Sequence, residues 1–318
     1  MSDRTPLVSV IVPTYNRPER LVRSLESVAD QTYEHLEVIV VDDGSETPAT
    51  DVVAPVREEL PYEVTVIRHD DNRGANAARN TGIREASGEF LAFLDDDDEW
   101  CPSKVTRQVD AFQRASTDLG LVYTALRLVD DDGTVLRTTD ASVAGDVTRQ
   151  LLCRNAIGSF SCVMVRSAAA ADAGPLDEAF PSWQDLDWYI RISEDWTVQP
   201  ISDPLVTNYA GTHDRITDDL ESLIEETYPR FLWKHRPRAA AYGGLFERKM
   251  LAWAAFRIGA WYALPAGQYA TARQFLLRAI TLYPFDPRFF LYAAIAVGGD
   301  PARIAFDRAK RLLSSMQG

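Results

Sequence analysis

The 318-residue sequence predicts an α/β fold: a mostly parallel sheet flanked by helices, followed by an α-helical C-terminal region. In the first hundred residues, short and continuously apolar segments alternate with amphipathic segments, a pattern typical of buried parallel strands covered by helices. From about residue 216 onward, helical periodicity replaces the strand patterns. Hydrophobic residues make up 46% of the chain, which is ordinary for a globular protein with a substantial core.

The elements of the α/β part follow one another in regular order. Four apolar strands are predicted at residues 7–13, 36–43, 62–69 and 90–94, with helices between them at 18–29, 49–60 and 76–86. Beyond residue 100 the pattern predicts a hairpin at 119–137 with its turn at 131–133, a strand at 159–166, a helix at 183–195 and a strand-rich segment at 196–217. The carboxyl ends of the parallel strands are therefore expected to lie along one edge of the sheet.

Two domains are expected: an α/β domain at residues 1–225 and an α-helical region at 226–318. Within the second, residues 259–287 predict two antiparallel helices, similar to a single tetratricopeptide-like unit. Ala272 and Ala279 are small enough to lie where such helices touch. One unit cannot stack into an array, so this region is expected to pack on the main domain, on a partner or on a membrane surface.

Charge and cysteine content restrict the environment of the protein. The formal net charge is −14, which argues against electrostatic binding to nucleic acid. There are 29 arginines and four lysines, a composition that fits a halophilic source and equally fits GC-rich coding. Cys101, Cys153 and Cys162 lack metal-ligand spacing and are expected to be free thiols in a reducing compartment. No signal-peptide pattern is present, so we expect a cytoplasmic protein, with peripheral contact to a membrane face through the C-terminal helices left open.

Polar residues follow each strand of the predicted parallel sheet. Four aspartates, Asp95 to Asp98, directly follow the apolar run at 90–94. Repulsion between neighbouring carboxylates favours either a solvated loop that blunts the strand end or a site completed by a divalent cation and a phosphate. Polar clusters also follow the other three strands, at 14–19, 42–47 and 70–80. All four loops are expected to meet in one crevice, which favours the second interpretation.

Five segments together carry a resemblance to a known family: VSVIVPTYNR, VIVVDDGS, NRGANAARNTGI, FLDDDDEWCPSK and WQDLDWYIR. In order and separation they resemble family 2 glycosyltransferases of the GT-A fold, over residues 7 to about 215. The resemblance implies a Rossmann-like domain that transfers a sugar from a nucleotide-diphosphate sugar donor to an acceptor hydroxyl. It also implies inversion at the anomeric carbon, with Mn²⁺ or Mg²⁺ as cofactor.

The resemblance further implies which residues bind the donor nucleotide. Pro13, Thr14 and Tyr15 occupy the positions that contact the nucleoside, with the Tyr15 ring available for stacking on the base; alternatively, they only shape a strand end. Asp43 matches the carboxylate that accepts a hydrogen bond from the base, although Asp-Gly-Ser is also good turn chemistry. Arg73, at the start of the third helix, is placed to face the phosphates or the base.

The four aspartates match the metal-binding DxD element of the family. The resemblance makes Asp95 and Asp97 the metal-side carboxylates, and hard oxygen ligands suit Mg²⁺ or Mn²⁺. Asp96 stands at the variable middle position, so whether Asp95 or Asp96 contacts the ribose stays open. Asp98 is expected to cap the helix that begins near residue 102. His213 falls where relatives place a histidine near the diphosphate, sometimes on the metal; a structural role is the alternative.

Inversion by direct displacement needs one base to remove the proton from the acceptor hydroxyl. The segment Gln184 to Trp188 matches the acidic element of the family, with Gln184 in place of the commoner Glu. The match makes Asp185 the base and Asp187 its structural neighbour. The alternative is that both aspartates only cap a helix.

Two other functions remain open from the sequence. A sugar nucleotidylyltransferase would also be an α/β protein with metal-binding acids, but it requires a glycine-rich phosphate loop where this chain has VPTYNRPER. A degenerate transferase, acting as a scaffold through its helical tail, would not need Asp43, Asp95, Asp97 and Asp185. The favoured acceptor is a glycan or a lipid-linked glycan, in lipid-linked glycan, glycoprotein or surface polysaccharide synthesis.

Overall fold

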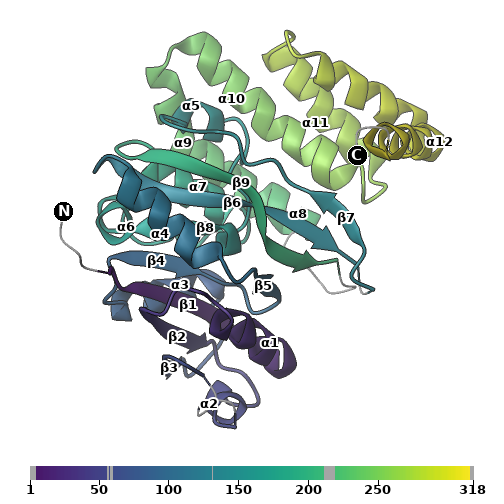
Figure 1. Cartoon of the computed structure of the whole chain (residues 1–318). Coiled ribbons are helices and arrows are strands. Elements are labelled where there is room, and N and C mark those ends of the chain that lie inside the picture. The colour runs from purple at the N-terminus through teal and green to yellow at the C-terminus, as the bar shows by residue number, and fades with distance from the viewer. Residues whose placement is uncertain (1–4, 56, 58–59, 131, 211–218, 316–318) are drawn as a thin grey trace. The chain divides into compact units, whose positions relative to one another are not determined.

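The computed structural model describes residues 5–315, without residues 56, 58–59, 131 and 211–218 (Figure 1). The chain divides into two compact units. The first consists of Met1–Leu151, Asn155–Ala179 and Gln184–His213, and the second of Leu152–Arg154, Phe180–Trp183 and Asp214–Gly318. The domain boundary at residue 225 stays a prediction.

The first half of the sheet is the parallel one that the sequence predicts. The strands β1 (Val8–Thr14), β2 (Leu36–Asp42), β3 (Glu63–Arg68) and β4 (Phe90–Phe93) lie in the order β3-β2-β1-β4, all parallel. The intervening helices are α1 (Pro18–Ala29), α2 (Ala49–Val53) and α3 (Ala75–Glu85). Helix α2 is shorter than the predicted 49–60. Ala54 is still helical, with φ of −52° and ψ of −44°, but Pro55 has no N–H group to continue the hydrogen-bond ladder.

Beyond β4 the sheet becomes mixed. Strand β8 (Val163–Arg166) lies antiparallel to β4, and β6 (Leu119–Val129) lies antiparallel to β8. Strand β9 (Thr197–Tyr209) runs parallel to β6, while the short strands β5 (Asp98–Trp100) and β7 (Val135–Thr138) pair antiparallel to β9 and β6. The β6–β7 pair is the predicted hairpin; Asp131 in its turn lies outside the described residues. The helices of this half are α4 (Lys104–Arg114), α5 (Thr148–Leu151), α6 (Ser167–Ala173) and α7 (Gln184–Ile192).

Aromatic packing fixes α7 against the end of β4. The ring of Trp188 on α7 meets Phe93 of β4 edge to face, with centroids 5.4 Å apart. Phe160, in the 3₁₀ turn Phe160–Cys162 before β8, packs on both Phe93 and Tyr189 of α7. These side chains are all buried, so the hydrophobic effect holds the start of α7 near the loop that follows β4.

The second unit is helical. Its elements are α8 (Leu220–Ser222), a π-helical turn at Leu223–Thr227, α9 (Tyr228–Ala241), α10 (Gly244–Arg257), a π-helical segment at Ile258–Ala263, α11 (Tyr269–Leu282) and α12 (Pro287–Ser315). Ala272 and Ala279 on α11 are fully buried. A Cβ atom on Gly259 would lie 2.8 Å from Leu276 Cγ, so the segments before and after the turn at 264–268 approach closely.

One stretch of α12, Pro287–Phe306, is long and apolar enough to cross a membrane by length and composition, with a mean hydropathy of 1.3. Gly299 within it has φ of 63° and ψ of −151°, so α12 is two helical pieces separated by a kink. The piece before Gly299 has about 12 residues, or about 18 Å of helix, against about 30 Å of bilayer core.

Candidate functional site

The four aspartates after β4 lie in four different environments. Asp95 is partly exposed and its Oδ1 pairs with Nη2 of Arg79, a buried residue of α3. The backbone N–H of Asp95 donates to the Ser161 hydroxyl at 3.1 Å. Arg79 in turn lies over the ring of Phe160, with its guanidinium carbon 4.2 Å from the centroid. Asp95 is therefore held by Arg79 at its side chain and by Ser161 at its backbone.

Asp96 is buried, with 4% of its surface exposed. Its carboxylate accepts hydrogen bonds from the Thr14 hydroxyl at 2.8 Å and from Arg17 Nη1 at 2.9 Å. Burial raises the pKa of Asp96 to about 6, and the Arg17 charge and the Thr14 hydrogen bond oppose that rise. The carboxylate therefore ties the loop after β1 to the loop after β4.

Asp97 is the most open of the four, with 37% of its side chain exposed. Its Oδ2 receives Arg17 Nη1 at 3.0 Å and lies 3.7 Å from Arg20 Nη1. Within the described chain, neither Oδ1 of Asp97 nor Oδ2 of Asp95 accepts a hydrogen bond. Each carboxylate thus keeps one oxygen available for a further ligand.

The prediction that Asp98 caps the next helix is wrong. Asp98 is the first residue of β5, is 1% exposed, and accepts a hydrogen bond from Asn208 Nδ2 of β9 at 2.7 Å. Helix α4 begins at Lys104, with Ser103 at its N-cap position. Because Asp98 pairs with Asn208 of β9, 110 positions further along the chain, local capping patterns do not reveal this role.

The carboxylates fit a metal ion that arrives with its substrate. Among the described residues, no group of three His, Cys, Asp or Glu side chains is placed to hold a metal by itself. Magnesium is commonly bound by one or two carboxylates, with substrate phosphates and water supplying the other ligands. Asp95 and Asp97, each with one available oxygen, match that arrangement. His213 lies outside the described residues.

The residues predicted to bind the nucleoside differ in exposure. Pro13 and Thr14 are buried at the end of β1, whereas Tyr15 is 44% exposed and leaves its ring free to stack. Asn16, next in the chain, has φ of 54°, a left-handed conformation that Asn tolerates better than most residues. The chain turns there, which directs Arg17 toward Asp96 and Asp97.

Asp43 is 3% exposed and already accepts three hydrogen bonds. The donors are His69 Nδ1 at 2.7 Å, the backbone N–H of Arg73 at 3.0 Å and the backbone N–H of Gly74 at 2.7 Å. Its carboxylate therefore organises the start of α3, where the Arg73 side chain lies half exposed, 3.6 Å from Glu178. Base recognition by Asp43 stays a prediction.

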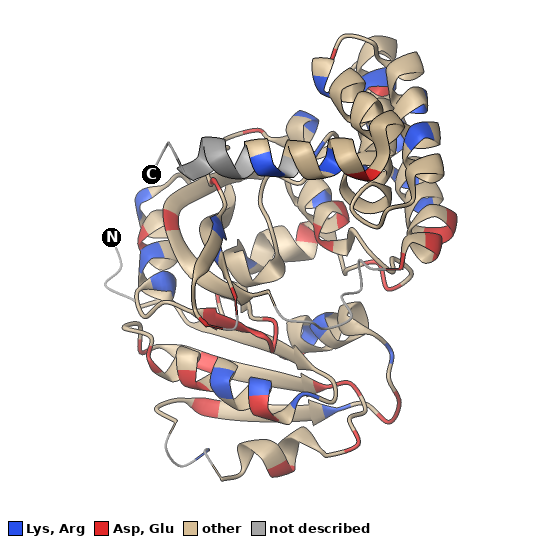
Figure 2. Ribbon diagram, turned by 90° about the vertical axis from the view of Figure 1, so that its right-hand side faces the viewer, with Lys and Arg blue, Asp and Glu red and all other residues tan. Residues whose placement is uncertain are grey.

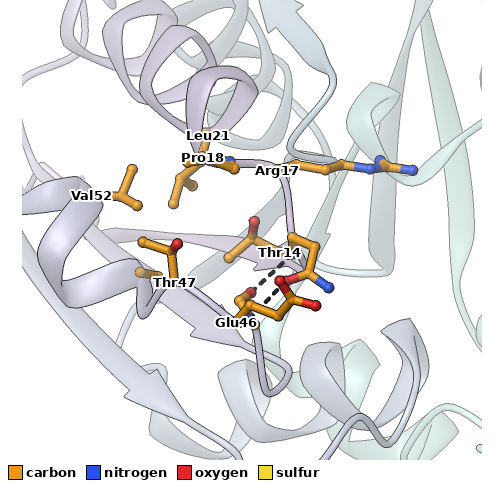
Figure 3. A pocket seen from close by; sticks show the side chains of 10 residues that line it. Thr14, Arg17, Pro18, Leu21, Glu46, Thr47 and Val52 are labelled. Carbon is orange, nitrogen blue, oxygen red and sulfur yellow. Dashed lines mark hydrogen bonds between the residues drawn. The ribbon is translucent and has the colours of Figure 1, made fainter.

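A pocket of about 300 Å³ opens beside the loop after β1 (Figure 3). Its wall includes Thr14, Pro18, Leu21, Thr47 and Val52. The Arg17 side chain points away from Thr47 and Val52 in Figure 3. Tyr15, Asp43 and Arg73 do not line this pocket, so it shares only Thr14 with the predicted nucleoside site.

Asp185 lies in the first turn of α7. Its Oδ1 accepts the backbone N–H of Leu186 at 2.7 Å, and its Oδ2 accepts Asn155 Nδ2 at 2.8 Å. The phenol of Tyr189, one turn further on, is buried, and burial together with the charges of Asp185 and Asp95 holds its pKa well above the ordinary value. Tyr189 therefore lies within electrostatic range of both Asp185 and Asp95.

The neighbours of Asp185 have structural roles. Asp187 is fully buried and pairs with Arg191 Nη2 at 3.0 Å. Within the described part of the chain, Oε1 of Gln184 is buried without a hydrogen-bond partner. Trp183 has φ of 60°, a strained value for a bulky residue, immediately before α7 begins.

Three residues at this site escape sequence reasoning: Arg17, Asn155 and Ser161. Each acts on an aspartate at least 30 positions away, so no local pattern reveals the partner. One signal is available for Asn155: Asn followed three residues later by Gly is a turn pattern, and it stands just before a predicted strand.

Comparisons with known proteins agree with the fold. The model of the family "Glycosyl transferase family 2" matches residues 9–169, half of the chain. An uncharacterised glycosyltransferase of Haemophilus influenzae is 30% identical over 202 residues, covering 63% of this chain and 67% of the relative. Glycosyltransferase AglE of Haloferax volcanii is 30% identical over 199 residues, covering 61% and 64%. The putative teichuronic acid biosynthesis glycosyltransferase TuaG of Bacillus subtilis is 35% identical over 136 residues, covering 43% and 53%.

Two solved structures are similar at the level of the fold. Mannosyltransferase PcManGT from Pyrobaculum calidifontis, in complex with GDP-Man and Mn²⁺, has a TM-score of 0.60 and 18% identity, covering 98% of this chain and 81% of that one. TarS of S. aureus in complex with UDP has a TM-score of 0.55 and 20% identity, covering 87% and 89%. With the sheet, the aspartate loop and the family match in agreement, the chain belongs to glycosyltransferase family 2 and has the GT-A fold.

Proposed function

We propose that this protein is a metal-dependent, inverting glycosyltransferase that moves a sugar from a nucleotide-diphosphate sugar to an acceptor hydroxyl. The observation that supports the proposal is that one short segment contacts both aspartates: Asn155 donates to Asp185 Oδ2 at 2.8 Å, and the Ser161 hydroxyl accepts the backbone N–H of Asp95 at 3.1 Å. Asp185 takes the proton from the acceptor hydroxyl as that oxygen attacks the anomeric carbon of the donor. The nucleotide diphosphate leaves from the opposite face.

The metal ion would be Mn²⁺ or Mg²⁺, held by Asp97 and Asp95 together with the donor phosphates. Bound there, the ion would offset the negative charge that develops on the departing diphosphate. The chain itself orients both carboxylates, through Arg17 and Arg20 for Asp97 and through Arg79 for Asp95. The proposal also includes two further roles: His213 would bind the metal, and Asp96 would contact the donor ribose.

The donor and acceptor are suggested by the similar proteins. PcManGT is described with GDP-Man, and TarS with UDP and with UDP-GlcNAc, so a nucleotide-diphosphate sugar is the natural first donor to test. The name of TuaG refers to teichuronic acid biosynthesis. We therefore propose a glycan or lipid-linked acceptor, in lipid-linked glycan, glycoprotein or surface polysaccharide synthesis.

The proposal is tested by incubating the full chain with UDP-GlcNAc or GDP-mannose and Mn²⁺ or Mg²⁺, and measuring the nucleotide diphosphate released. Asp185→Asn should lower the rate by roughly 10²- to 10⁴-fold, the usual contribution of a general base. Its affinity for the nucleotide diphosphate should not change, since Asp185 does not hold the donor. Asp195→Asn, at an exposed aspartate beyond α7, is the matched control and should keep the wild-type rate. An Asp185→Asn enzyme with normal turnover contradicts the assignment.

We also propose that the protein works in the cytoplasm, with its C-terminal helices in peripheral contact with an anionic membrane face. Residues 226–318 contain 14 Lys and Arg against five Asp and Glu, a net formal charge of +9, although the whole chain carries −14. Figure 2 shows these basic residues distributed over the helices of the second unit. Large apolar side chains are exposed there too: Trp233 by 77%, Phe285 by 70% and Val297 by 72%. Basic and aromatic residues together favour the surface of an anionic bilayer.

Vesicle flotation tests the membrane contact. The protein should float with vesicles containing phosphatidylglycerol, more weakly at high salt, and not with neutral phosphatidylcholine vesicles. Changing Trp233 and Phe285 together to Ser should reduce binding. Leu136→Ser, at a residue of β7 that is 55% exposed, removes a similar apolar side chain from the first unit and should leave binding unchanged. Equal binding to neutral vesicles would contradict the electrostatic part of the proposal.

A further inference from the structure

The segment 155–162 contacts both aspartates on which the proposed function rests. At its start, Asn155 Nδ2 donates to Asp185 Oδ2 at 2.8 Å. Near its end, the Ser161 hydroxyl accepts the backbone N–H of Asp95, and the Ser161 carbonyl accepts Nε1 of Trp100 at 3.0 Å. A single short segment therefore links the carboxylate of α7 to the loop after β4.

The orientation of the Asn155 amide is determined by its own turn. Its Oδ1 accepts the backbone N–H groups of Ile157 and Gly158, both at 3.0 Å. With the oxygen occupied, the two Nδ2 hydrogens have fixed directions: one toward Asp185 and one toward the Gly158 carbonyl at 3.3 Å. Gly158 has φ of 105°, a conformation that glycine adopts without strain, so the turn is maintained by backbone geometry.

A neutral amide such as that of Asn155 is a better hydrogen-bond partner for a catalytic base than a cationic side chain would be. A hydrogen bond to a carboxylate oxygen stabilises the ionised form and fixes the rotamer. A Lys or Arg at this position would add a full positive charge and would lower the basicity of Asp185 much further. A neutral amide orients the carboxylate while leaving it able to accept a proton.

We infer that Asn155 is the positioning residue for the base: through Nδ2 it holds the Asp185 carboxylate in the orientation that accepts the acceptor proton. This inference rests on the proposed function, in which Asp185 is the base. Asn155 acts through Asp185 and does not itself touch the sugar. Asp95 after β4 and Arg79 on α3, which together with Asp185 act on the phenol of Tyr189, are unchanged by substitutions at Asn155.

Two substitutions separate positioning from a merely structural role. Asn155→Asp keeps the oxygen that accepts from Ile157 and Gly158, so the turn survives, but it replaces the donor to Asp185 with a second carboxylate. Asn155→Ala removes both the donor and the turn contact. A structural role predicts damage in Asn155→Ala only, whereas positioning predicts lost turnover in both variants.

The experiment measures turnover of UDP-GlcNAc or GDP-mannose, affinity for UDP or GDP with Mn²⁺, and the pH profile of turnover. Both variants should lose roughly 10- to 100-fold in kcat, the scale of loss expected when a reacting group is slightly misplaced. Nucleotide affinity should stay at the wild-type value. The acidic limb of the pH profile should move to higher pH, most in Asn155→Asp, because a neighbouring carboxylate disfavours ionisation of Asp185.

A second measurement does not depend on the substrate. Titration of the side-chain carboxyl carbons by ¹³C NMR, with the Asp185 signal assigned through Asp185→Asn, should show a raised Asp185 pKa in both Asn155 variants. In an Asp185→Asn background, Asn155→Asp should cause no further loss of turnover, because the two residues act as one unit.

The outcomes distinguish this inference from the proposed function. If Asp185→Asn is inactive but both Asn155 variants keep wild-type kcat and pH profile, the positioning role is overturned while the base assignment stands. If Asp185→Asn keeps its activity, the base assignment itself fails. Loss of nucleotide affinity in Asn155→Asp would also overturn the inference, since it would show that Asn155 supports the donor site instead.

Discussion

Nη1 of Arg17 lies 2.9 Å from Oδ1 of Asp96, although 79 positions separate the two residues in the sequence. The same nitrogen reaches Asp97 at 3.0 Å. One arginine from the loop after β1 therefore offsets the charge of two neighbouring aspartates after β4. This contact explains how consecutive carboxylates can remain close together at the end of a buried strand.

Arg17→Met should lower the free energy of unfolding by about 1–3 kcal/mol, because it leaves the buried Asp96 carboxylate without its cation. The effect stays below that of a fully buried pair, since 37% of the Arg17 side chain is exposed and solvent screens its charge. Urea denaturation at neutral pH measures it. In the Asp96→Asn background, Arg17→Met should lower the free energy of unfolding by much less. Arg23→Met, which breaks a partly exposed pair between Arg23 of α1 and Glu99 of β5, is the control. Equal costs in both backgrounds would show that Arg17 and Asp96 are not coupled.

Asp97→Asn should remove the Mn²⁺-dependent part of the affinity for UDP or GDP and leave the fold intact. The reason is that Asp97 is partly exposed and supplies an available carboxylate oxygen, which an amide replaces poorly as a metal ligand. Calorimetry with and without Mn²⁺ measures the difference. Asp110→Asn, at an exposed pair on α4, serves as control. If the mutant keeps its metal-dependent affinity, Asp97 is not a ligand.

Asp43→Asn should destabilise the protein by about 1–3 kcal/mol, because the amide cannot accept all three hydrogen bonds that the carboxylate accepts. The donors on Arg73 and Gly74 begin α3, so their displacement should also weaken nucleotide binding. Denaturation and UDP calorimetry on one preparation separate the two effects. Asp71→Asn, at an exposed neighbour, should change neither. A loss of stability with unchanged affinity would restrict Asp43 to a structural role.

Lys104 makes stability depend on pH. Its side chain is fully buried, with Nζ 2.9 Å from Gln108 Oε1 and 3.9 Å from the Trp100 ring centroid. Burial lowers the pKa of Lys104 to about 7. Between that value and the unfolded pKa of about 10.4, the unfolded chain binds more protons, so this contribution to stability rises with pH by about 1.4 kcal/mol per unit.

The comparison of Lys104→Met with the wild type isolates this effect. The stability of the mutant relative to the wild type should be highest at pH 7 and should decrease by pH 9, as the wild-type penalty for burying the lysine fades. The loss of the hydrogen bond from Lys104 to Gln108 changes this stability difference by an amount that does not depend on pH. Chemical denaturation at the two pH values provides the measurement. A difference that stays constant from pH 7 to 9 would contradict the buried, depressed lysine.

Two glycines of the site loops form a matched pair. Gly44 and Gly74 both have positive φ, of 82° and 91°. A Cβ atom on Gly44 would lie 2.9 Å from the carbonyl carbon of Asp71, whereas one on Gly74 would meet nothing within 4 Å. Both Ala substitutions should cost about 1–3 kcal/mol of backbone strain, and Gly44→Ala should cost more because the loop at Asp71 must also move. Equal decreases in melting temperature for the two variants would show that the loop at Asp71 moves without a measurable cost in stability.

The sequence by itself determined the alternation of strands and helices, the helix at 18–29 and the edge of the sheet where polar loops gather. These follow from periodicity and from Pro, Gly and Asp at strand ends, which are local signals. The sequence also determined the family, because five segments stand in the order and spacing of glycosyltransferase family 2. No local signal, however, shows which of the four consecutive aspartates are buried and which keep a carboxylate oxygen available.

Only the tertiary structure decided what each aspartate does. Asp96 and Asp98 are buried by contacts with Thr14, Arg17 and Asn208, while Asp95 and Asp97 keep an oxygen available. Likewise, Asn155 reaches Asp185 across 30 positions, through the docking of α7 on β4. Carboxylates that are alike in sequence differ in pKa and role because burial and long-range partners set the energy of their charge, and both arise only when distant segments pack together.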